Sequence, residues 1–167
     1  MYDIAIIDSG VTLQNNNTVD GVFIRYSANK IVVECGNIND DIGHGTVIYQ
    51  MIKKSSPQSK IFVVKIIDGS NKVDEHILYY ALKYIKDNIR CRVINISLGV
   101  KICNKVKKFR ELCAEIINSG TIIVSAFDND NCFSYPACFP EVIGVDNNEK
   151  IKHITDYEYV ESSPVNI

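Results

Sequence analysis

The chain has 167 residues, 46% of them hydrophobic and 23% charged, which suits one globular domain with a core of its own. Its net charge of −2 gives no electrostatic reason to expect nucleic acid or an anionic membrane as a partner. The sequence has no secretory signal after Met1 and no apolar run near the ~20 residues that cross a membrane, so neither a secreted nor a membrane-spanning protein is expected.

Apolar runs alternate with amphipathic stretches along the chain. The runs predict strands at residues 3–7, 21–26, 30–34, 60–67, 92–98, 121–126 and 142–145, and the amphipathic stretches predict helices at 44–54, 74–88 and 105–119. The clearest helix is 74–88, where apolar residues recur at helical spacing. In helix 44–54 we expect Val47, Ile48 and Met51 on one side.

Strands that alternate with helices form right-handed βαβ units and a parallel sheet. These strands are continuous apolar runs, as expected where helices cover both faces of the sheet. We therefore predict an α/β fold of three layers, α/β/α, with a central parallel sheet. Function in such folds gathers at the carboxyl ends of the strands. Asp8, Leu98-Gly99 and Asp128-Asn129 each follow a predicted strand directly.

The sequence contains six cysteines: Cys35, Cys91, Cys103, Cys113, Cys132 and Cys138. They form no Cys-x-x-Cys pair and match no zinc pattern, so no metal site is predicted. An even number of cysteines is also compatible with disulfides in a secreted protein. In the absence of a secretory signal, reduced thiols and a cytoplasmic location are the favoured interpretation.

Two charged clusters are interpreted as solvated surface. Five basic residues lie close together at Lys101, Lys105, Lys107, Lys108 and Arg110. A basic cluster can bind nucleic acid, but the exposed face of a helix is the better interpretation here. Asp40 and Asp41 are likewise expected in a solvated loop.

Asp8 stands in the run Ile4-Ala5-Ile6-Ile7-Asp8-Ser9-Gly10-Val11. An acid after a strand can be a metal ligand or a plain turn residue, so Asp8 alone is weak evidence for a function. A haloacid-type phosphatase needs a second aspartate two residues later, where this chain has Gly10. A nucleotide-binding fold needs a glycine-rich phosphate loop, and the sequence has none.

The motif Gly43-His44-Gly45-Thr46 is more specific, because a glycine stands on each side of the histidine. The glycines would let the backbone approach a substrate closely, although a loop histidine between two flexible neighbours is an alternative explanation. An aspartate can hold an imidazole in one tautomer and stabilise its protonated form, as a general base requires. Asp8 and His44 together therefore favour a catalytic pair.

These motifs resemble those of the subtilisin-like serine peptidases, or subtilases (peptidase family S8). The triad of that family runs Asp, His, Ser along the chain. Ile6-Ile7-Asp8-Ser9-Gly10-Val11 is similar to the aspartate motif, and Gly43-His44-Gly45-Thr46 is similar to the histidine motif. The resemblance implies a subtilisin-like fold in which Asp8 and His44 are catalytic residues.

Three further segments resemble the same family. Asn95-Ile96-Ser97-Leu98-Gly99 is similar to the strand that lines the substrate cleft, which implies that Ser97, Leu98 and Gly99 bind extended substrate. The segment 124–129 is similar to the strand that ends in the oxyanion asparagine, so Asn129 would donate its side-chain amide to the developing oxyanion. The segment 135–145 is similar to a Tyr-Pro-Ala segment of the family. Calcium is common in subtilases, but no calcium ligands are assigned here.

The family's nucleophile lies in a Gly-Thr-Ser motif on a helix after an Ala-Pro-Gly turn, and no Gly-Thr-Ser occurs in these 167 residues. Ser9, Ser97 and Ser125 are poor substitutes, because Ser9 adjoins the acid, Ser97 would bind substrate and Ser125 is expected inside a strand. We therefore expect residues 1–167 to form a partial subtilase catalytic domain, truncated before the nucleophile helix and inactive alone.

Two functions stay open. The first is part of a serine endopeptidase that hydrolyses peptide bonds, with peptide or protein substrates and an intracellular role in trimming a modified peptide or a regulator. The second is a non-catalytic half-domain or pseudoenzyme that binds extended peptides by strand addition. Retention of Asp8, His44 and Asn129 favours the first. In either case, exposed apolar sheet surface predicts self-association or a complementing C-terminal segment.

Overall fold

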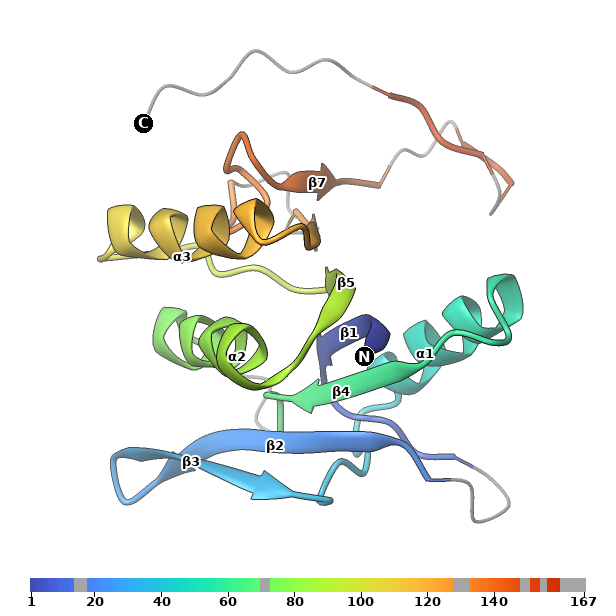
Figure 1. Ribbon diagram of the computed structural model, residues 1–167, viewed down its shortest axis with the longest axis horizontal. Coiled ribbons are helices and arrows are strands. Elements are labelled where there is room, and N and C mark those ends of the chain that lie inside the picture. The colour runs from blue at the N-terminus through green and yellow to red at the C-terminus, as the bar shows by residue number, and fades with distance from the viewer. Residues whose placement is uncertain (14–17, 70–72, 128–132, 148–150, 154–155, 160–167) are drawn as a thin grey trace.

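A single seven-stranded sheet organises the chain in this computed structural model, which describes residues 1–13, 18–69, 73–127, 133–147, 151–153 and 156–159. The strands are β1 (Tyr2–Asp8), β2 (Asp20–Ser27), β3 (Lys30–Cys35), β4 (Ile61–Lys65), β5 (Cys91–Ile96), β6 (Ile122–Ala126) and β7 (Ile143–Val145). Their order in the sheet is β3-β2-β4-β1-β5-β6-β7, so that β1 lies at the centre (Figure 1).

All neighbouring strands are parallel except β2 and β3, which form an antiparallel hairpin. The hairpin turn consists of Ala28 and Asn29, both with positive φ, as a two-residue type I′ turn requires. The predicted parallel sheet is thus confirmed, with one antiparallel strand at its edge. Every predicted strand end lies within two residues of the observed one.

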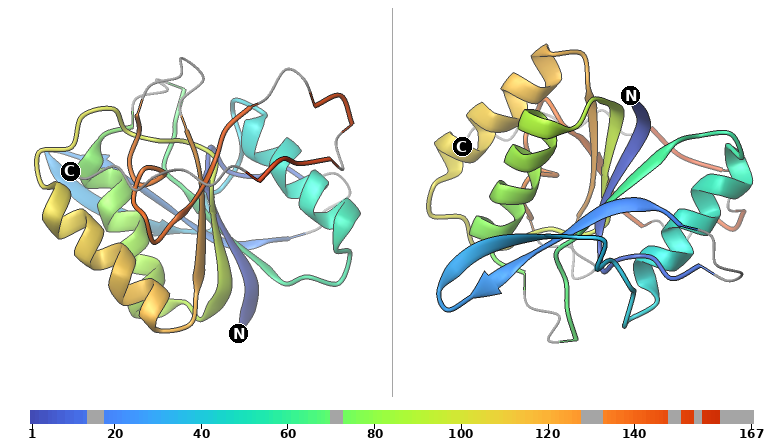
Figure 2. Two further views of the ribbon diagram at one scale, coloured as in Figure 1. Left: turned by 90° about the horizontal axis from the view of Figure 1, so that it is seen from above. Right: turned by 60° about the horizontal axis from the view of Figure 1, so that its bottom comes forward.

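Helices cover both faces of the sheet. Helix α1 (His44–Ser55) lies against one face, while α2 (Glu75–Asn88) and α3 (Val106–Asn118) lie side by side against the other (Figure 2). The predicted α/β fold is therefore confirmed. The apolar character of the β4 sequence is explained by its position, because all five residues of this strand are buried between the two helical layers.

The larger core lies between the sheet and helices α2 and α3. The predicted apolar stripe of α2 is confirmed, because its five members are all buried: Ile77, Leu78, Ala81, Leu82 and Ile85. In α3, Phe109, Leu112, Cys113 and Ile116 are buried as predicted, and the half-buried Val106 packs against them.

A smaller core lies under α1, and here the predicted helix face is wrong. Ile48, Tyr49 and Ile52 pack against the sheet, whereas Val47 and Met51 are 52% and 42% exposed. The face toward the sheet is fixed by the turn that starts the helix at His44, which the apolar spacing alone does not determine. No helix among the described residues is long and apolar enough to cross a membrane.

Candidate active site

Asp8 is the last residue of β1 and lies at the centre of the sheet's carboxyl edge, in register with Lys65 of β4. Its side chain is buried. The carboxylate accepts hydrogen bonds from the backbone N–H of Ser9 at 2.7 Å and from the Ser9 hydroxyl at 3.2 Å. A buried carboxylate needs such partners, and they also fix the direction in which its remaining acceptor sites point.

His44 begins α1 and meets Asp8 across the sheet edge. Its Nδ1 lies 2.8 Å from Oδ1 and 3.0 Å from Oδ2 of the carboxylate. The Asp8 side chain is 1% exposed and the His44 side chain 52% exposed, so the carboxylate is buried while the imidazole is accessible to solvent. With Nδ1–H donated to the carboxylate, Nε2 is the nitrogen left to accept a proton.

Two glycines allow this close approach of α1 to the end of β1. Gly43 precedes the helix with φ +96°, a backbone conformation that side chains rarely adopt. Gly45 packs directly on the backbone, and a Cβ there would collide with the Gly10 carbonyl oxygen. The Gly45 N–H also donates to the Ser9 hydroxyl at 3.0 Å. These two glycines therefore allow the start of the helix to lie directly against the aspartate.

Asp40 is a residue whose importance the sequence analysis missed. Instead of standing in a solvated loop, its carboxylate ties the start of α1 together. Oδ1 accepts from the N–H groups of Ile42 and Gly43 at 3.0 and 2.8 Å, and Oδ2 accepts from the N–H and hydroxyl of Thr46 at 2.8 and 2.7 Å. Burial alone would raise the pKa of Asp40, but the hydrogen bonds from Thr46 and Gly43 lower it to about 2.

Lys65 anchors the other end of the same loop. Its side chain is 4% exposed. The ammonium donates a hydrogen bond to the carbonyl oxygen of Asn39 and a second one to Asp41, where Nζ lies 2.9 Å from Oδ2. A buried lysine at the end of an apolar strand was a signal available in the sequence, since such a charge requires partners. The loop before His44 is therefore held both by a buried ammonium and by the carboxylate of Asp40.

Comparison with known proteins agrees with this geometry. The model of the subtilase family matches residues 3–163. The chain belongs to the subtilase family. A search of the curated proteins returned no match.

Three solved structures similar to this subtilase chain are proteases by name. The prenylagaramide maturation protease PagA has a TM-score of 0.60 at 19% identity, with 85% of this chain and 52% of that one covered. The epidermin leader peptide processing serine protease EpiP from Staphylococcus aureus has a TM-score of 0.63 at 20% identity, over 86% of this chain and 45% of that one.

The psychrophilic subtilisin-like protease Apa1 from the Antarctic psychrotroph Pseudoalteromonas sp. AS-11 has a TM-score of 0.64 at 21% identity, over 86% of this chain and 35% of that one. At such low sequence identities, the structural similarity establishes a shared fold and nothing more. The subtilase chain described here spans about half, or less, of the length of these three proteins.

The segment predicted to bind substrate lies at the carboxyl end of β5, the strand beside β1. Ser97, Leu98 and Gly99 are half-buried, and the Ser97 hydroxyl accepts a hydrogen bond from the Asn95 amide at 2.8 Å. The next residue, Val100, pairs with Tyr135 through two backbone hydrogen bonds of 3.0 and 2.9 Å. The segment therefore lies at the same edge of the sheet as Asp8, one strand away. Asn129, the predicted oxyanion donor, lies outside the described residues.

No serine of the described part of this subtilase chain donates to His44. Ser9 is engaged with Asp8 and Gly45, and Ser97 with Asn95. Ser125 is completely buried inside β6, as predicted, and its hydroxyl has no hydrogen-bond partner among the described residues. The described residues thus bring an acid and a base together, and none of their serine hydroxyls is hydrogen-bonded to the base.

The described residues form neither a cluster of metal-binding side chains nor a disulfide bond. They contain no group of three or more His, Cys, Asp or Glu side chains that could hold a metal ion. Cys35, Cys91, Cys103, Cys113 and Cys138 are free thiols, and Cys132 lies outside the described residues. Burial raises the pKa of the Cys113 thiol to about 12.

Proposed function

We propose that this chain supplies the aspartate and histidine of a serine endopeptidase site, and that the nucleophilic serine comes from residues outside these 167. The single observation that carries the proposal is the contact of 2.8 Å between Nδ1 of His44 and the buried carboxylate of Asp8. In this arrangement His44 would take the proton of the attacking serine, and Asp8 would orient the imidazole and stabilise its cation. Residues 1–167 would then form a partial catalytic domain.

Two further groups complete the proposed mechanism. Ser97, Leu98 and Gly99 would hold an extended peptide beside His44, since they lie at the carboxyl end of the strand next to β1. Asn129 would donate its side-chain amide to the oxyanion that forms when serine attacks the peptide carbonyl. Peptide or protein substrates follow from the family.

The proposed role is proteolytic maturation of a precursor peptide or regulator in the cytoplasm. Two solved structures of the same fold support this proposal, since one is a prenylagaramide maturation protease and the other processes the epidermin leader peptide. The exposed apolar side chains of α1 and β7 support a further part of the proposal, namely that a serine-bearing C-terminal segment or a second copy covers them.

Labelling with a fluorophosphonate probe tests the proposal, because such a probe reacts with an activated serine. We expect the 167-residue chain to stay unlabelled in intact mass spectra. A protein that extends it with a Gly-Thr-Ser segment, or a mixture of the two pieces, should be labelled and should cleave peptides. In that complete protein, His44→Ala should abolish labelling.

Either of two results would contradict the proposal. Labelling of the 167-residue chain would place a working nucleophile inside it. Failure of the complete, folded protein to be labelled would leave the non-catalytic alternative, a half-domain that binds extended peptides at Ser97–Gly99 by strand addition.

A further inference from the structure

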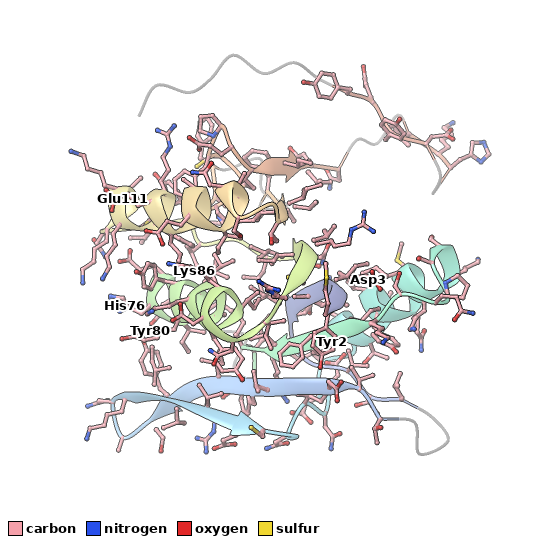
Figure 3. All side chains as sticks on the ribbon, in the orientation of Figure 1. Tyr2, Asp3, His76, Tyr80, Lys86 and Glu111 are labelled. Carbon is pink, nitrogen blue, oxygen red and sulfur yellow. The ribbon has the colours of Figure 1, made fainter. Side chains whose placement is uncertain are left out.

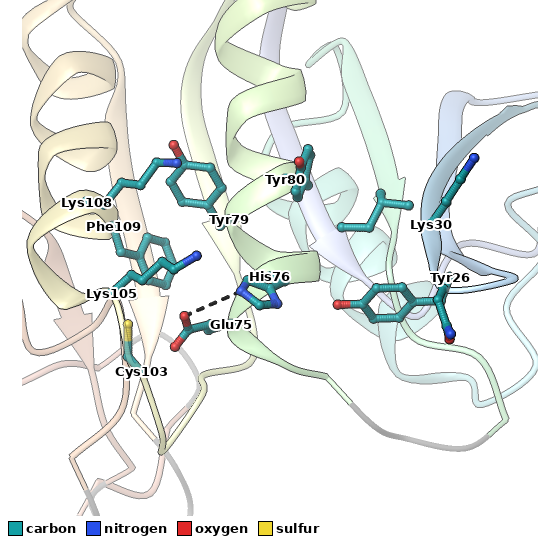
Figure 4. A pocket seen from close by; sticks show the side chains of 12 residues that line it. Tyr26, Lys30, Glu75, His76, Tyr79, Tyr80, Cys103, Lys105, Lys108 and Phe109 are labelled. Atoms are coloured by element: carbon teal, nitrogen blue, oxygen red, sulfur yellow. Dashed lines mark ion pairs between the residues drawn. The ribbon is translucent and has the colours of Figure 1, made fainter.

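A cavity of about 520 Å³ opens at the carboxyl edge of the sheet, away from the proposed catalytic pair. It lies between the tip of the β2–β3 hairpin, the start of α2 and the start of α3 (Figure 4). His44 begins α1 on the opposite face of the sheet, so the cavity and the Asp8–His44 pair share an edge but are covered by different helical layers.

Three lysines from different parts of the chain are among the residues that line the cavity. Lys30 comes from the hairpin, and Lys105 and Lys108 come from the start of α3. The Lys108 ammonium lies 5.1 Å from the centroid of the Tyr79 ring. Neither Lys30 nor Lys105 forms an ion pair with any residue that the structure describes. Lys105 and Lys108 of the basic cluster noted in the sequence are exposed to solvent, as predicted, and they also border this cavity.

The carboxylates nearby are already engaged. Glu75 is buried and accepts a hydrogen bond from the backbone N–H of Asn104. Asp74 caps α2 by accepting from the Ile77 N–H at 2.9 Å, and it also accepts from the Tyr26 hydroxyl at 3.0 Å. The lining sets three lysines against one carboxylate, that of Glu75, so the cavity presents an excess of positive charge to a ligand.

Aromatic rings form the apolar part of the cavity wall. Tyr79 and Phe109 pack edge to face with their centroids 6.2 Å apart. Tyr80, together with His76, projects from the outer side of α2 (Figure 3). Such rings offer broad surfaces to bulky apolar side chains, so the cavity suits a ligand with both carboxylate and apolar groups.

The hairpin side of the cavity is held in place. Burial and the hydrogen bond to Asp74 raise the pKa of the Tyr26 phenol to about 12, so the phenol stays protonated and keeps the hairpin tied to α2. The turn that presents Lys30 carries Ala28 at φ +48°, a conformation that costs a residue with a Cβ some energy. The hairpin tip is thus fixed despite a local strain.

We propose that this cavity is an accessory substrate site that binds an acidic segment of the peptide substrate, with carboxylates against the lysines and bulky apolar side chains against the aromatic rings. The proposal rests on the proposed peptidase function. Gly99 of the predicted substrate-binding segment is six residues from Lys105, a span of no more than about 20 Å of chain. An extended substrate segment of similar length therefore joins the two sites.

Binding to the 167-residue chain tests the site directly, because every lining residue belongs to this chain. The probe is a fluorescein-labelled peptide that alternates glutamate with leucine and phenylalanine, and its counterpart has glutamine in place of glutamate. We expect fluorescence anisotropy to show that the glutamate peptide binds more tightly and that its affinity falls as salt rises. The double variant Lys30→Glu/Lys105→Glu should weaken its binding about tenfold.

The matched control is Lys54→Glu/Lys60→Glu, which changes the net charge equally on exposed lysines outside the cavity. Circular dichroism checks that both double variants fold. Should the cavity variant fail to fold, chemical-shift changes of the wild-type chain on adding the glutamate peptide replace it, and these should centre on His76 and Tyr80. Equal binding of the two peptides, equal loss in the two variants, or shifts elsewhere would overturn the proposal.

This experiment separates the accessory site from the proposed function. Binding that depends on Lys30 and Lys105 in a protein that never cleaves peptides would keep the site and reject the peptidase. Cleavage by the complete protein without any preference for acidic peptides would keep the peptidase and reject the site.

Discussion

At the scale of single residues, the geometry of Asp8 and His44 specifies a tautomer. Nδ1 of His44 lies within hydrogen-bond distance of the buried carboxylate, which only accepts hydrogen bonds. Nδ1 must therefore carry the proton, and Nε2 is unprotonated in the neutral ring. Asp8→Asn keeps the size of the side chain but can offer an amide N–H to the ring, so Nδ1 is no longer required to be the donor.

We therefore predict that Asp8→Asn removes the preference of His44 for the Nδ1–H tautomer, as read from the nitrogen chemical shifts of the ring. His76 serves as the internal control, since it lies on α2 and has no contact with Asp8. In the complete peptidase, the same change should lower kcat by about 10⁴-fold. An unchanged His44 tautomer in the variant would show that Asp8 does not orient the ring.

The sequence predicted part of this site but not its support. Asp8 and His44 could be found because each stands in a short motif, and the order of the motifs is informative. Asp40 gave no such signal, and for Lys65 the sequence indicated only a buried charge that needs partners, because both roles depend on which groups the fold brings near them. The four hydrogen bonds accepted by Asp40 exist only once the loop has turned into α1.

At the scale of elements, the start of α1 depends on a titratable group. Because the folded pKa of Asp40 is about 2, below its ordinary 3.8, the carboxylate stabilises the fold fully above pH 3.8, and this contribution is lost as the pH falls toward 2. We predict that Asp40→Asn destabilises the chain by about 1 kcal/mol at neutral pH and flattens the pH dependence of its unfolding between about pH 4 and 2.

Denaturant unfolding monitored by circular dichroism over this pH range measures the effect. Asp87→Asn is the control, since Asp87 also pairs with a neighbour, Lys83, but lies exposed on α2. The control should change stability far less, because exposed ion pairs contribute little. An Asp40→Asn variant with the wild-type pH profile would contradict the capping role.

The β2–β3 hairpin carries a second element-scale prediction. A type I′ turn needs positive φ at both central residues, and Asn is much better suited to the first of them than Ala. Ala28→Asn should therefore stabilise the chain by about 0.5–1 kcal/mol, visible as a higher midpoint of thermal unfolding. The same substitution at Ala114, inside α3, should lower the midpoint. Equal shifts at both positions would contradict the turn assignment.

Helices α1 and α2 show how far the pattern of apolar residues predicts which face of a helix is buried. In α2 the apolar stripe was unambiguous, and all five of its members are buried. In α1 the residues Val47, Ile48, Met51 and Ile52 have the same spacing as four members of that stripe, yet Ile48 and Ile52 face the sheet while Val47 and Met51 face outward. That choice is made by the packing of Gly45 on Gly10.

At the scale of the whole molecule, apolar side chains remain exposed on both the outer side of α1 and the edge strand β7. Val47 and Met51 are exposed on the helix, and Ile143 and Val145 on the strand. An unpaired edge strand and an uncovered apolar helix face both promote association with another chain.

We therefore predict that the 167-residue chain self-associates as its concentration rises, as measured by light scattering, and that Val47→Lys/Met51→Glu shifts it toward monomer. This double variant leaves the net charge unchanged, so repulsion between whole molecules does not explain the shift. Ile102→Lys/Tyr157→Glu is the matched control, since both side chains are exposed and neither residue belongs to α1 or β7. A wild-type chain that stays monomeric at high concentration would mean that these surfaces need no cover, and would remove the structural argument for a complementing segment.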